Sequence, residues 1–350
     1  MSAYELTKNE LLVRPRRWLV TGVAGFIGSH LLEQLLSLNQ TVVGLDNFST
    51  GSAKNLEDVR NSVSLEQFAR FAVIKGDITR LEDCRRARQN VDFVLHQAGL
   101  GSVPRSIKNP LASHEVNVSG FLKVIEASRE NSVRRIVYAS SSSVYGDSTE
   151  LPKQEERIGN ALSPYAATKQ IDEIYAQVFA RTYGMEFIGL RYFNVFGPRQ
   201  DPHGPYAAVI PLWVSALIEN RPVLINGDGT TSRDFCYVHN VVQANILAAT
   251  CPNPRAVNQV YNVAVNARTT LNDLFAIIRS GLAEKCAHAA SVQPQYQAPR
   301  PGDIQHSQAD ISKARRLLGY EPTHALKSGS LETLSWYLRA DRQTVPAPVS

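Results

Sequence analysis

Long hydrophobic runs, clustered cysteines and histidine motifs are all missing from this chain of 350 residues. No stretch approaches the length of a membrane-spanning helix, and the polar start over 1–8 lacks an apolar signal-peptide core, so we expect a cytoplasmic protein. The four cysteines lie far apart, without metal or redox spacing, which indicates reduced thiols. The eight histidines contain no H-E-x-x-H pattern. We therefore expect no bound metal and no membrane contact.

The chain also has no dense run of basic residues. The net charge is +5, but the basic residues are scattered, with only short clusters over 14–17, 85–88 and 313–316. A nucleic-acid surface needs a denser basic patch, so we expect no nucleic-acid partner. The hydrophobic fraction of 43% and the charged fraction of 20% are ordinary for a globular protein that can bury a large core.

What the chain does contain is a glycine turn near its amino terminus. A short apolar strand from residue 17 leads into Gly22, Gly25 and Gly28, and a helical pattern follows over 29–36. Glycine at this spacing makes a tight turn, lets backbone N–H groups reach a pyrophosphate, and lets helix and strand pack closely. A second strand ends in Asp46, about twenty residues beyond the glycines, where a carboxylate can bond an adenosine ribose. Because this carboxylate would repel a 2′-phosphate, the pattern favours NAD over NADP.

Short apolar strands continue along the chain, each preceded by a plausible helix, over 71–77, 91–97 and 135–139. Such alternation predicts a Rossmann-like α/β fold with a doubly wound parallel sheet. A helix over 163–183 and a strand over 187–192 extend it. Ligands of these sheets gather at the carboxyl ends of the strands.

Beyond Asn194 a turn-rich stretch over 197–205 predicts that the chain leaves the sheet to build a smaller mixed α/β lobe. Residues 237–250 and 260–264 indicate a return to the sheet, and 271–286 and 311–318 indicate helices. The predicted organisation is an extension over 1–15, an NAD-binding domain over 16–195 with returns near 235–265, a substrate-binding lobe over 196–234 and 266–342, and a tail over 343–350.

Tyr165 and Lys169 are four residues apart on the expected helix, so their side chains share one face. A tyrosine is normally protonated at neutral pH because its unperturbed pKa is near 10. A nearby ammonium and the positive nicotinamide ring of oxidised NAD favour the phenolate and can make such a tyrosine a base. The alternative is an ordinary exposed helix pair, which the preceding dinucleotide turn and the serine-rich strand end disfavour.

Together these motifs resemble a known family. The glycine turn, the segment from Ser141 to Gly146 (S-S-S-V-Y-G) and Tyr165-x-x-x-Lys169 are similar, in this order, to the extended short-chain dehydrogenase/reductase superfamily. The segments 191–198 (RYFNVFGP) and 227–238 (GDGTTSRDFCYV) narrow the resemblance to nucleotide-sugar epimerases similar to UDP-galactose 4-epimerase. It extends from about residue 18 to residue 337. Members commonly form homodimers through two long helices, for which 122–129 and 171–180 are candidates.

The resemblance implies a reaction. Tyr165 would remove the proton of the sugar 4-OH while the C4 hydride passes to NAD, and the resulting 4-keto sugar would turn and take the hydride back on its other face. Lys169 would also bond the nicotinamide ribose, and Ser141 and Ser143 would bond the reacting oxygen. Relatives that dehydrate or decarboxylate their sugars carry Glu, or Asp-Glu, where this chain has Ser142 and Ser143. A serine hydroxyl cannot readily shuttle that proton, so those reactions are disfavoured.

The resemblance also implies two sets of contacts. The expected NAD contacts are Gly22, Gly25, Phe26, Ile27, Gly28, Asp46, Asn47, Ser49, Gly51, Asp77, Ile78, Gln97, Ala98, Asn117, Tyr165 and Lys169. The expected UDP-sugar contacts are Gly101, Ser102, Ser141, Ser142, Ser143, Asn194, Gln200, Ala208, Val209, Leu224, Arg233, Arg300, Asp303 and Ser307. Among these, Arg233 and Arg300 would clamp the diphosphate, because a guanidinium binds phosphate oxygens in pairs.

Substrate choice is predicted from three small residues. Ser307 matches a family position that is a bulky tyrosine in enzymes limited to hexoses without an N-acetyl group, while Gly101 and Ala208 stand where lysine and asparagine are common. The expected reaction is interconversion of UDP-GlcNAc and UDP-GalNAc, with UDP-Glc and UDP-Gal poorer. One alternative is a UDP-uronate 4-epimerase, with Arg105 or Arg268 as the cation for the sugar carboxylate. Another is a non-catalytic NAD-binding protein of the same fold.

Overall fold

A seven-stranded parallel sheet forms the centre of the computed structural model, which describes residues 1–131, 133–204, 206–299 and 304–344. The strand order is β11–β6–β5–β4–β1–β2–β3, and every pairing is parallel. The strands are β1 Arg17–Thr21, β2 Thr41–Asp46, β3 Phe71–Lys75, β4 Phe93–His96, β5 Arg135–Ser141, β6 Phe187–Tyr192 and β11 Gln259–Val263. The predicted Rossmann-like α/β fold is confirmed. The order reverses between β1 and β4, the switch point at which such sheets bind ligands.

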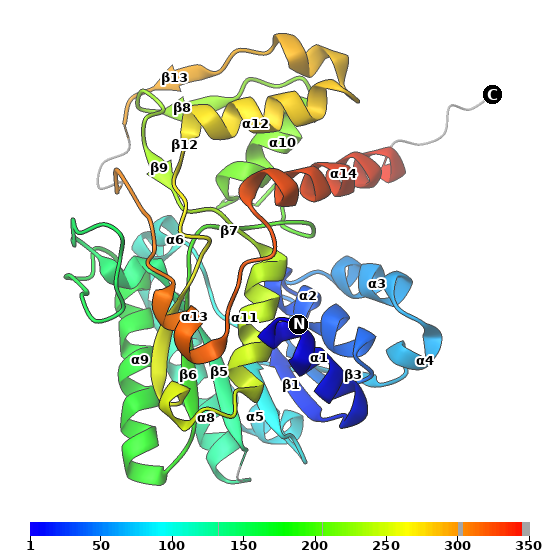
Figure 1. The fold of residues 1–350 in the computed structure, drawn as a ribbon, viewed down its shortest axis with the longest axis vertical. Helices are drawn as coiled ribbons and strands as arrows, with labels where there is room; N and C mark the ends of the chain where they lie inside the picture. Colours follow the sequence, from blue (N-terminus) through cyan, green and yellow to red (C-terminus); the bar gives the residue numbers. More distant parts are fainter. Residues whose placement is uncertain (132, 205, 300–303, 345–350) are drawn as a thin grey trace.

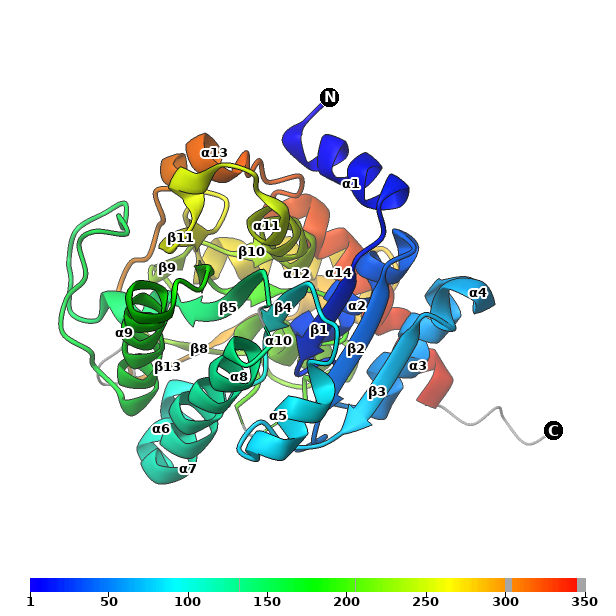
Figure 2. The same ribbon diagram turned by 90° about the horizontal axis from the view of Figure 1, so that it is seen from below.

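Helices cover both faces of the sheet (Figures 1 and 2). On one face α2 Phe26–Ser37 and α11 Val238–Thr250 pack on the strands, and on the other lie α5 Leu81–Ala87, α8 Gly120–Arg129 and α9 Pro164–Tyr183. The central strands are buried throughout, which is why they appear in the sequence as continuous apolar runs. Short helices complete both layers. Two of them contact α2, namely α3 Ala53–Ser62 and α4 Leu65–Phe68, while α6 Val103–Lys108, α7 Pro110–His114 and a π-helical turn Glu115–Ser119 contact α9.

Local sequence determines where α9 begins and ends. The Ser163 side chain caps its first turn by accepting from the backbone N–H of Ala166, and proline occupies the first helical position. The helix stops at Gly184, whose φ of 68° is the left-handed conformation that glycine adopts without strain. Tyr165 therefore lies in the first turn and Lys169 one turn later on the same face.

The second lobe packs around its own apolar cluster, above the sheet in Figure 1. Its helices are α10 Val209–Ile218, α12 Leu271–Ala283 and α14 Leu326–Thr344. Three two-stranded sheets join β8 Leu224–Asn226 to β13 Gln295–Gln297, β9 Ser232–Arg233 to β12 Thr269–Thr270, and β7 Val195–Phe196 to β10 Cys236–Tyr237. The expected return to the sheet consists of helix α11 followed by edge strand β11. Helix α13 Ser312–Leu318, within the segment assigned to the smaller lobe, contacts β11 and α11.

Residues 1–15 are attached to this body through helix α1 Ala3–Val13, which contacts α11. The fully buried side chain of Gln40 holds its carboxyl end. The Gln40 amide donates to the carbonyl oxygens of Leu11 and Leu38, at 2.9 and 2.6 Å, while its oxygen accepts from Arg16 N and Trp18 Nε1. One buried amide thus joins α1 to the start of β1 and to the turn before β2.

None of the helices in the described part of the chain is both long and apolar enough to cross a bilayer. The segments 122–129 and 171–180 lie on α8 and α9, where Ile174 and Val178 are exposed. A homodimer through these helices stays a prediction.

Gln40→Leu should lower the free energy of unfolding by at least about 2 kcal/mol, because three buried polar groups and one partly buried group lose their partner. Urea denaturation measures this change. Gln34→Leu is the matched control: its side chain bonds only Ser37 within the described chain, at an exposed site, and its effect should stay within about 0.5 kcal/mol. Equal effects of the two substitutions would show that Gln40 does not hold α1.

Candidate active site

The three glycines of the turn meet where β1 passes into α2. Gly22 has a φ of 69°, and a side-chain carbon on it would lie 2.8 Å from the backbone nitrogen of Ala98. A side-chain carbon on Gly28 would overlap the Gly22 carbonyl. Gly25 is the N-cap of α2, and no side chain of the described residues caps that helix. The amino end of α2 is therefore available to an anion such as a pyrophosphate.

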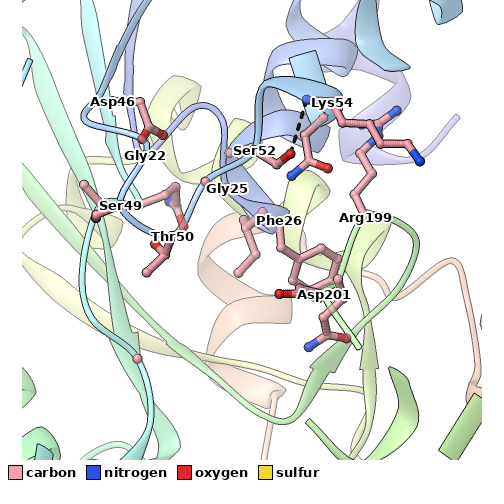
Figure 3. Close-up of a pocket in the computed structure, with 18 of the residues that line it drawn as sticks. Gly22, Gly25, Phe26, Asp46, Ser49, Thr50, Ser52, Lys54, Arg199 and Asp201 are labelled. Carbon is pink, nitrogen blue, oxygen red and sulfur yellow. Dashed lines mark hydrogen bonds between the residues drawn. The ribbon is translucent and has the colours of Figure 1, made fainter. Parts of the chain in front are cut away.

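Asp46, at the end of β2, braces this turn. Its carboxylate accepts from the backbone N–H groups of Ala24 and Phe48, both at 2.8 Å, and it is buried. Each carboxylate oxygen keeps a second acceptor site, so the contacts leave capacity for the predicted bond to a ribose. Figure 3 shows Asp46 beside Gly22.

A cavity of about 800 Å³ opens from this turn. Most of the predicted cofactor residues line it, namely Gly22, Gly25, Phe26, Ile27, Gly28, Asp46, Asn47, Ser49, Gly51, Ile78, Gln97 and Ala98. Figure 3 shows Ser49 and Thr50 near the turn, with Arg199 and Asp201 on another side of the cavity. The fold therefore brings these residues together around one cavity. That each of them contacts NAD stays a prediction.

Asp77 and Asn117 hydrogen-bond two residues that line this cavity, Asn47 and Leu100. Asp77 accepts from Asn47 Nδ2 at 2.8 Å, and although partial burial opposes it, hydrogen bonds from Thr79 and Asn47 lower the pKa of Asp77. The Asn117 side chain bonds both the N–H and the carbonyl of Leu100, at 2.7 and 3.2 Å, and thereby holds the loop after β4.

Lys169 is buried next to that loop. A side-chain carbon on Gly99, which lines the cavity, would lie 4.0 Å from Lys169 Nζ. The ammonium donates to Asp172 Oδ2 at 3.1 Å. Burial opposes the charged form, but the charges of Asp172 and Tyr165 raise the pKa of Lys169 overall, so it stays protonated. Burial also raises the pKa of Asp172 to about 6, against the opposing effect of Lys169.

The serine-rich end of β5 leads into a 3-10 turn over 142–145. Ser141 Oγ donates to Ser143 Oγ at 3.1 Å and accepts from Ser143 N at 3.1 Å. Ser142 and Ser143 line a second cavity of about 560 Å³, together with Asn194, Arg233 and Ser307. Tyr165 is half-buried at the start of α9, and its neighbours Ser163 and Ala166 line this second cavity.

The two cavities share one loop. Gly99, Leu100 and Gly101 line the larger cavity, whereas Val103 and Pro104 line the smaller one. A dinucleotide in the larger cavity and a sugar in the smaller cavity would therefore meet near Lys169 and the serine turn.

Other residues of the predicted substrate site do not line the smaller cavity. Gly101 and Gln200 line the larger one, because Gly101 lies on the shared loop and Gln200 on the segment beside Tyr337. Their role in binding the substrate stays a prediction. Ser102, with φ 99°, caps α6, Ala208 and Val209 begin α10, and Leu224 is partly exposed on β8. Arg300 and Asp303 lie outside the described residues.

The structure adds residues that the sequence analysis did not single out. Lys108 and Lys153 line the smaller cavity, and Trp336 and Tyr337 of α14 line the larger one. These positions carry no motif, and only the tertiary packing of α6, the loop after β5 and α14 brings them to the site.

The dinucleotide turn, the switch-point cavity and the Tyr165–Lys169 pair beside the serine turn define an extended short-chain dehydrogenase/reductase. The chain belongs to the NAD dependent epimerase/dehydratase family, whose model matches residues 18–264, and NAD is its cofactor. Its similarities support UDP-sugar 4-epimerase activity.

Three comparisons illustrate this. The UDP-glucose 4-epimerase of Mycolicibacterium smegmatis is 36% identical over 92% of this chain and 98% of its own. The structure of a UDP-N-acetylglucosamine 4-epimerase from Methanobrevibacter ruminantium with UDP-N-acetylmuramic acid is 36% identical, with a TM-score of 0.84 over 93% of this chain and 99% of that one. The structure of a UDP-glucuronic acid 4-epimerase from Bacillus cereus with UDP-glucuronic acid and NAD is 29% identical, with a TM-score of 0.82 over 93% and 99%.

Asp172→Asn tests the balance between burial and ion pairing at Lys169. In the folded state the carboxyl holds its proton up to about pH 6, whereas the unfolded chain releases it near about pH 4. The folded state thus binds more protons between these values, so this contribution to stability is present at low pH and is lost as the pH rises. Relative to Asp172→Asn, the wild type should lose about 3 kcal/mol of unfolding free energy between about pH 4 and pH 7, measured by urea denaturation.

Asp228→Asn is the matched control. Asp228 is exposed, and hydrogen bonds from Thr230 lower its pKa, so the wild type should gain stability relative to this variant as the pH rises. The same direction for Asp172→Asn would contradict the account, because it would mean that pairing with Lys169 outweighs burial.

Proposed function

We propose that this chain 4-epimerises UDP-N-acetylhexosamines, interconverting UDP-GlcNAc and UDP-GalNAc, and acts more slowly on UDP-Glc and UDP-Gal. The observation that carries the proposal is Ser307, a small buried residue in the wall of the cavity that also contains Ser143 and Asn194. A tyrosine there would take up space next to the sugar. The Methanobrevibacter relative, which holds the N-acetylated ligand UDP-N-acetylmuramic acid, supports a related pocket.

The residues of the chain divide the chemistry between them. Tyr165 removes the proton of the sugar 4-OH, and the ammonium of Lys169 stabilises the phenolate. The hydroxyls of Ser141 and Ser143, already bonded to each other at 3.1 Å, orient the reacting oxygen. NAD, held by the glycine turn and Asp46, would supply the hydride acceptor for C4 oxidation and the hydride donor for the return step. Arg233, in the same cavity, binds the diphosphate.

The smaller cavity argues against elimination chemistry. Among the described residues no carboxylate lines it, and positions 142 and 143 are both serine. The nearby Glu173 is occupied, because it pairs with Arg191 at 2.8 Å and accepts from Ser140 at 2.6 Å. A dehydratase or decarboxylase would need a further acid–base group at this place.

A UDP-uronate 4-epimerase is the second candidate, and one observation favours it. Lys108 and Lys153 line the sugar cavity and could neutralise a carboxylate. Lys153 already donates to the carbonyl of Ser148, and burial lowers the pKa of its ammonium. Lys108 is therefore the better candidate of the two for binding a carboxylate. Arg105 instead stacks on Tyr206, 4.9 Å from the ring centroid, and Arg268 is exposed.

Tyr165→Phe should lower kcat for 4-epimerisation by about 10²–10⁴-fold, the usual contribution of a general base, with NAD content unchanged. Product formation from UDP-GlcNAc and bound dinucleotide are measured on the same preparation. Tyr175→Phe, on the same helix, is the control and should keep wild-type activity. Wild-type activity in Tyr165→Phe would show that Tyr165 is not the base of this reaction.

Ser307→Tyr should lower kcat/KM for UDP-GlcNAc by about 10–200-fold through steric exclusion of the acetamido group, and leave UDP-Glc within about threefold. The assay compares UDP-GlcNAc, UDP-Glc and UDP-glucuronate side by side. Ser307→Ala, which leaves the room for the acetamido group open, should retain activity on both UDP-GlcNAc and UDP-Glc. Unchanged N-acetyl kinetics in Ser307→Tyr would reject the gate, and UDP-glucuronate as the best wild-type substrate would favour the second candidate.

A further inference from the structure

A cluster of two histidines and one glutamate lies apart from the reacting groups, between α11 and α14. His239 is the second residue of α11, His324 precedes α14, and Glu332 lies on α14. One potential ligand atom from each of the three lies within 4.8 Å of the others. Because these residues are distant in the sequence, their spacing matches no metal-binding motif.

We propose that His239, His324 and Glu332 bind one zinc ion that fastens α14 to α11. Two imidazoles and a carboxylate, with the remaining position left to water, are a common protein ligand set for zinc. Oxygen-seeking cations such as Mg²⁺ and Ca²⁺ do not favour imidazole, so they are poor candidates here.

Distances support this assignment. His324 Nε2 and Glu332 Oε1 are 3.1 Å apart. Zinc–ligand bonds of about 2.0–2.2 Å place tetrahedral ligand atoms about 3.3–3.5 Å from each other, so this pair already has nearly the required separation. His239 is exposed, and its ligand nitrogen lies within 4.8 Å of the other two ligand atoms, so a side-chain adjustment of at most about 1–2 Å closes the triangle.

The ligands are also held from behind. Thr323 Oγ1 bonds His324 Nδ1 at 2.8 Å, so the nitrogen that would bind the ion is Nε2, which bonds Glu332 Oε1 directly in this structure. Tyr237 donates to Glu332 Oε2 at 2.7 Å. The backbone around His324 is tied to the fully buried Asn240, which donates to the His324 carbonyl at 2.8 Å. Such outer contacts orient ligands in metal sites.

The local charge depends on Glu332. The amino end of α11 opposes a cation, and the nearby Arg199 is balanced by its ion pair with Glu33. Glu332 therefore supplies the net negative charge of the cluster. Because Trp336, one turn along α14, lines the NAD cavity, an ion at this place would stiffen one wall of that cavity.

The test uses untagged, NAD-loaded protein treated with a chelator and then titrated with ZnCl₂ by calorimetry, with thermal unfolding followed in parallel. The wild type should bind one Zn²⁺ per chain and unfold at a higher temperature with zinc. Glu332→Gln, which keeps the shape of the side chain, and His239→Asn should each weaken binding at least about tenfold and abolish the thermal shift.

His114→Ala is the control, because His114 is an exposed histidine far from the cluster on α7, and its affinity should equal that of the wild type. Unfolding curves in chelator show whether each variant is folded before titration. Failure of the wild type to bind zinc, or wild-type affinity in both Glu332→Gln and His239→Asn, would overturn the proposal. Neither result would bear on the epimerase reaction, which does not use these residues.

Discussion

The close approach of α2 to β1 is the constraint on which the rest of the site depends. At Gly28 there is no space for even one side-chain carbon, because the Gly22 carbonyl occupies it. This contact aims the amino end of α2 into the switch-point cavity, and Asp46 secures the turn through the backbone of Ala24 and Phe48. A larger residue in the turn would move the helix and remove the anion site, whatever the other residues did.

A second constraint is electrostatic. The ammonium of Lys169 is buried beside Gly99 and has a carboxylate, Asp172, 3.1 Å away. Burying a charge is costly unless it is paired, so Asp172 stabilises the ammonium when no substrate is present. It also weakens the positive potential that acts on Tyr165, and the pair therefore sets how strongly the proposed base is activated.

Much of this could be predicted from the sequence, because local patterns carry it. The central strands are buried on both faces and appear as apolar runs, Ser163 and Gly184 limit α9, and the glycine spacing indicates the turn. Other parts could not be predicted, since they depend on distant segments meeting. Nothing in the spacing of Gln40 and Leu11 reveals the hydrogen bond between them. Similarly, Lys108 and Lys153 reach the smaller cavity only through the packing of α6 and the loop after β5.

The central claim is that the sugar is oxidised and reduced at C4 without exchange with water. The most direct measurement is to incubate the enzyme with UDP-GlcNAc carrying deuterium at C4 and to examine the epimerised product by mass spectrometry and NMR. The account predicts that deuterium stays at C4 of the product, since the same hydride leaves and returns. Replacement of that deuterium by solvent hydrogen would contradict it.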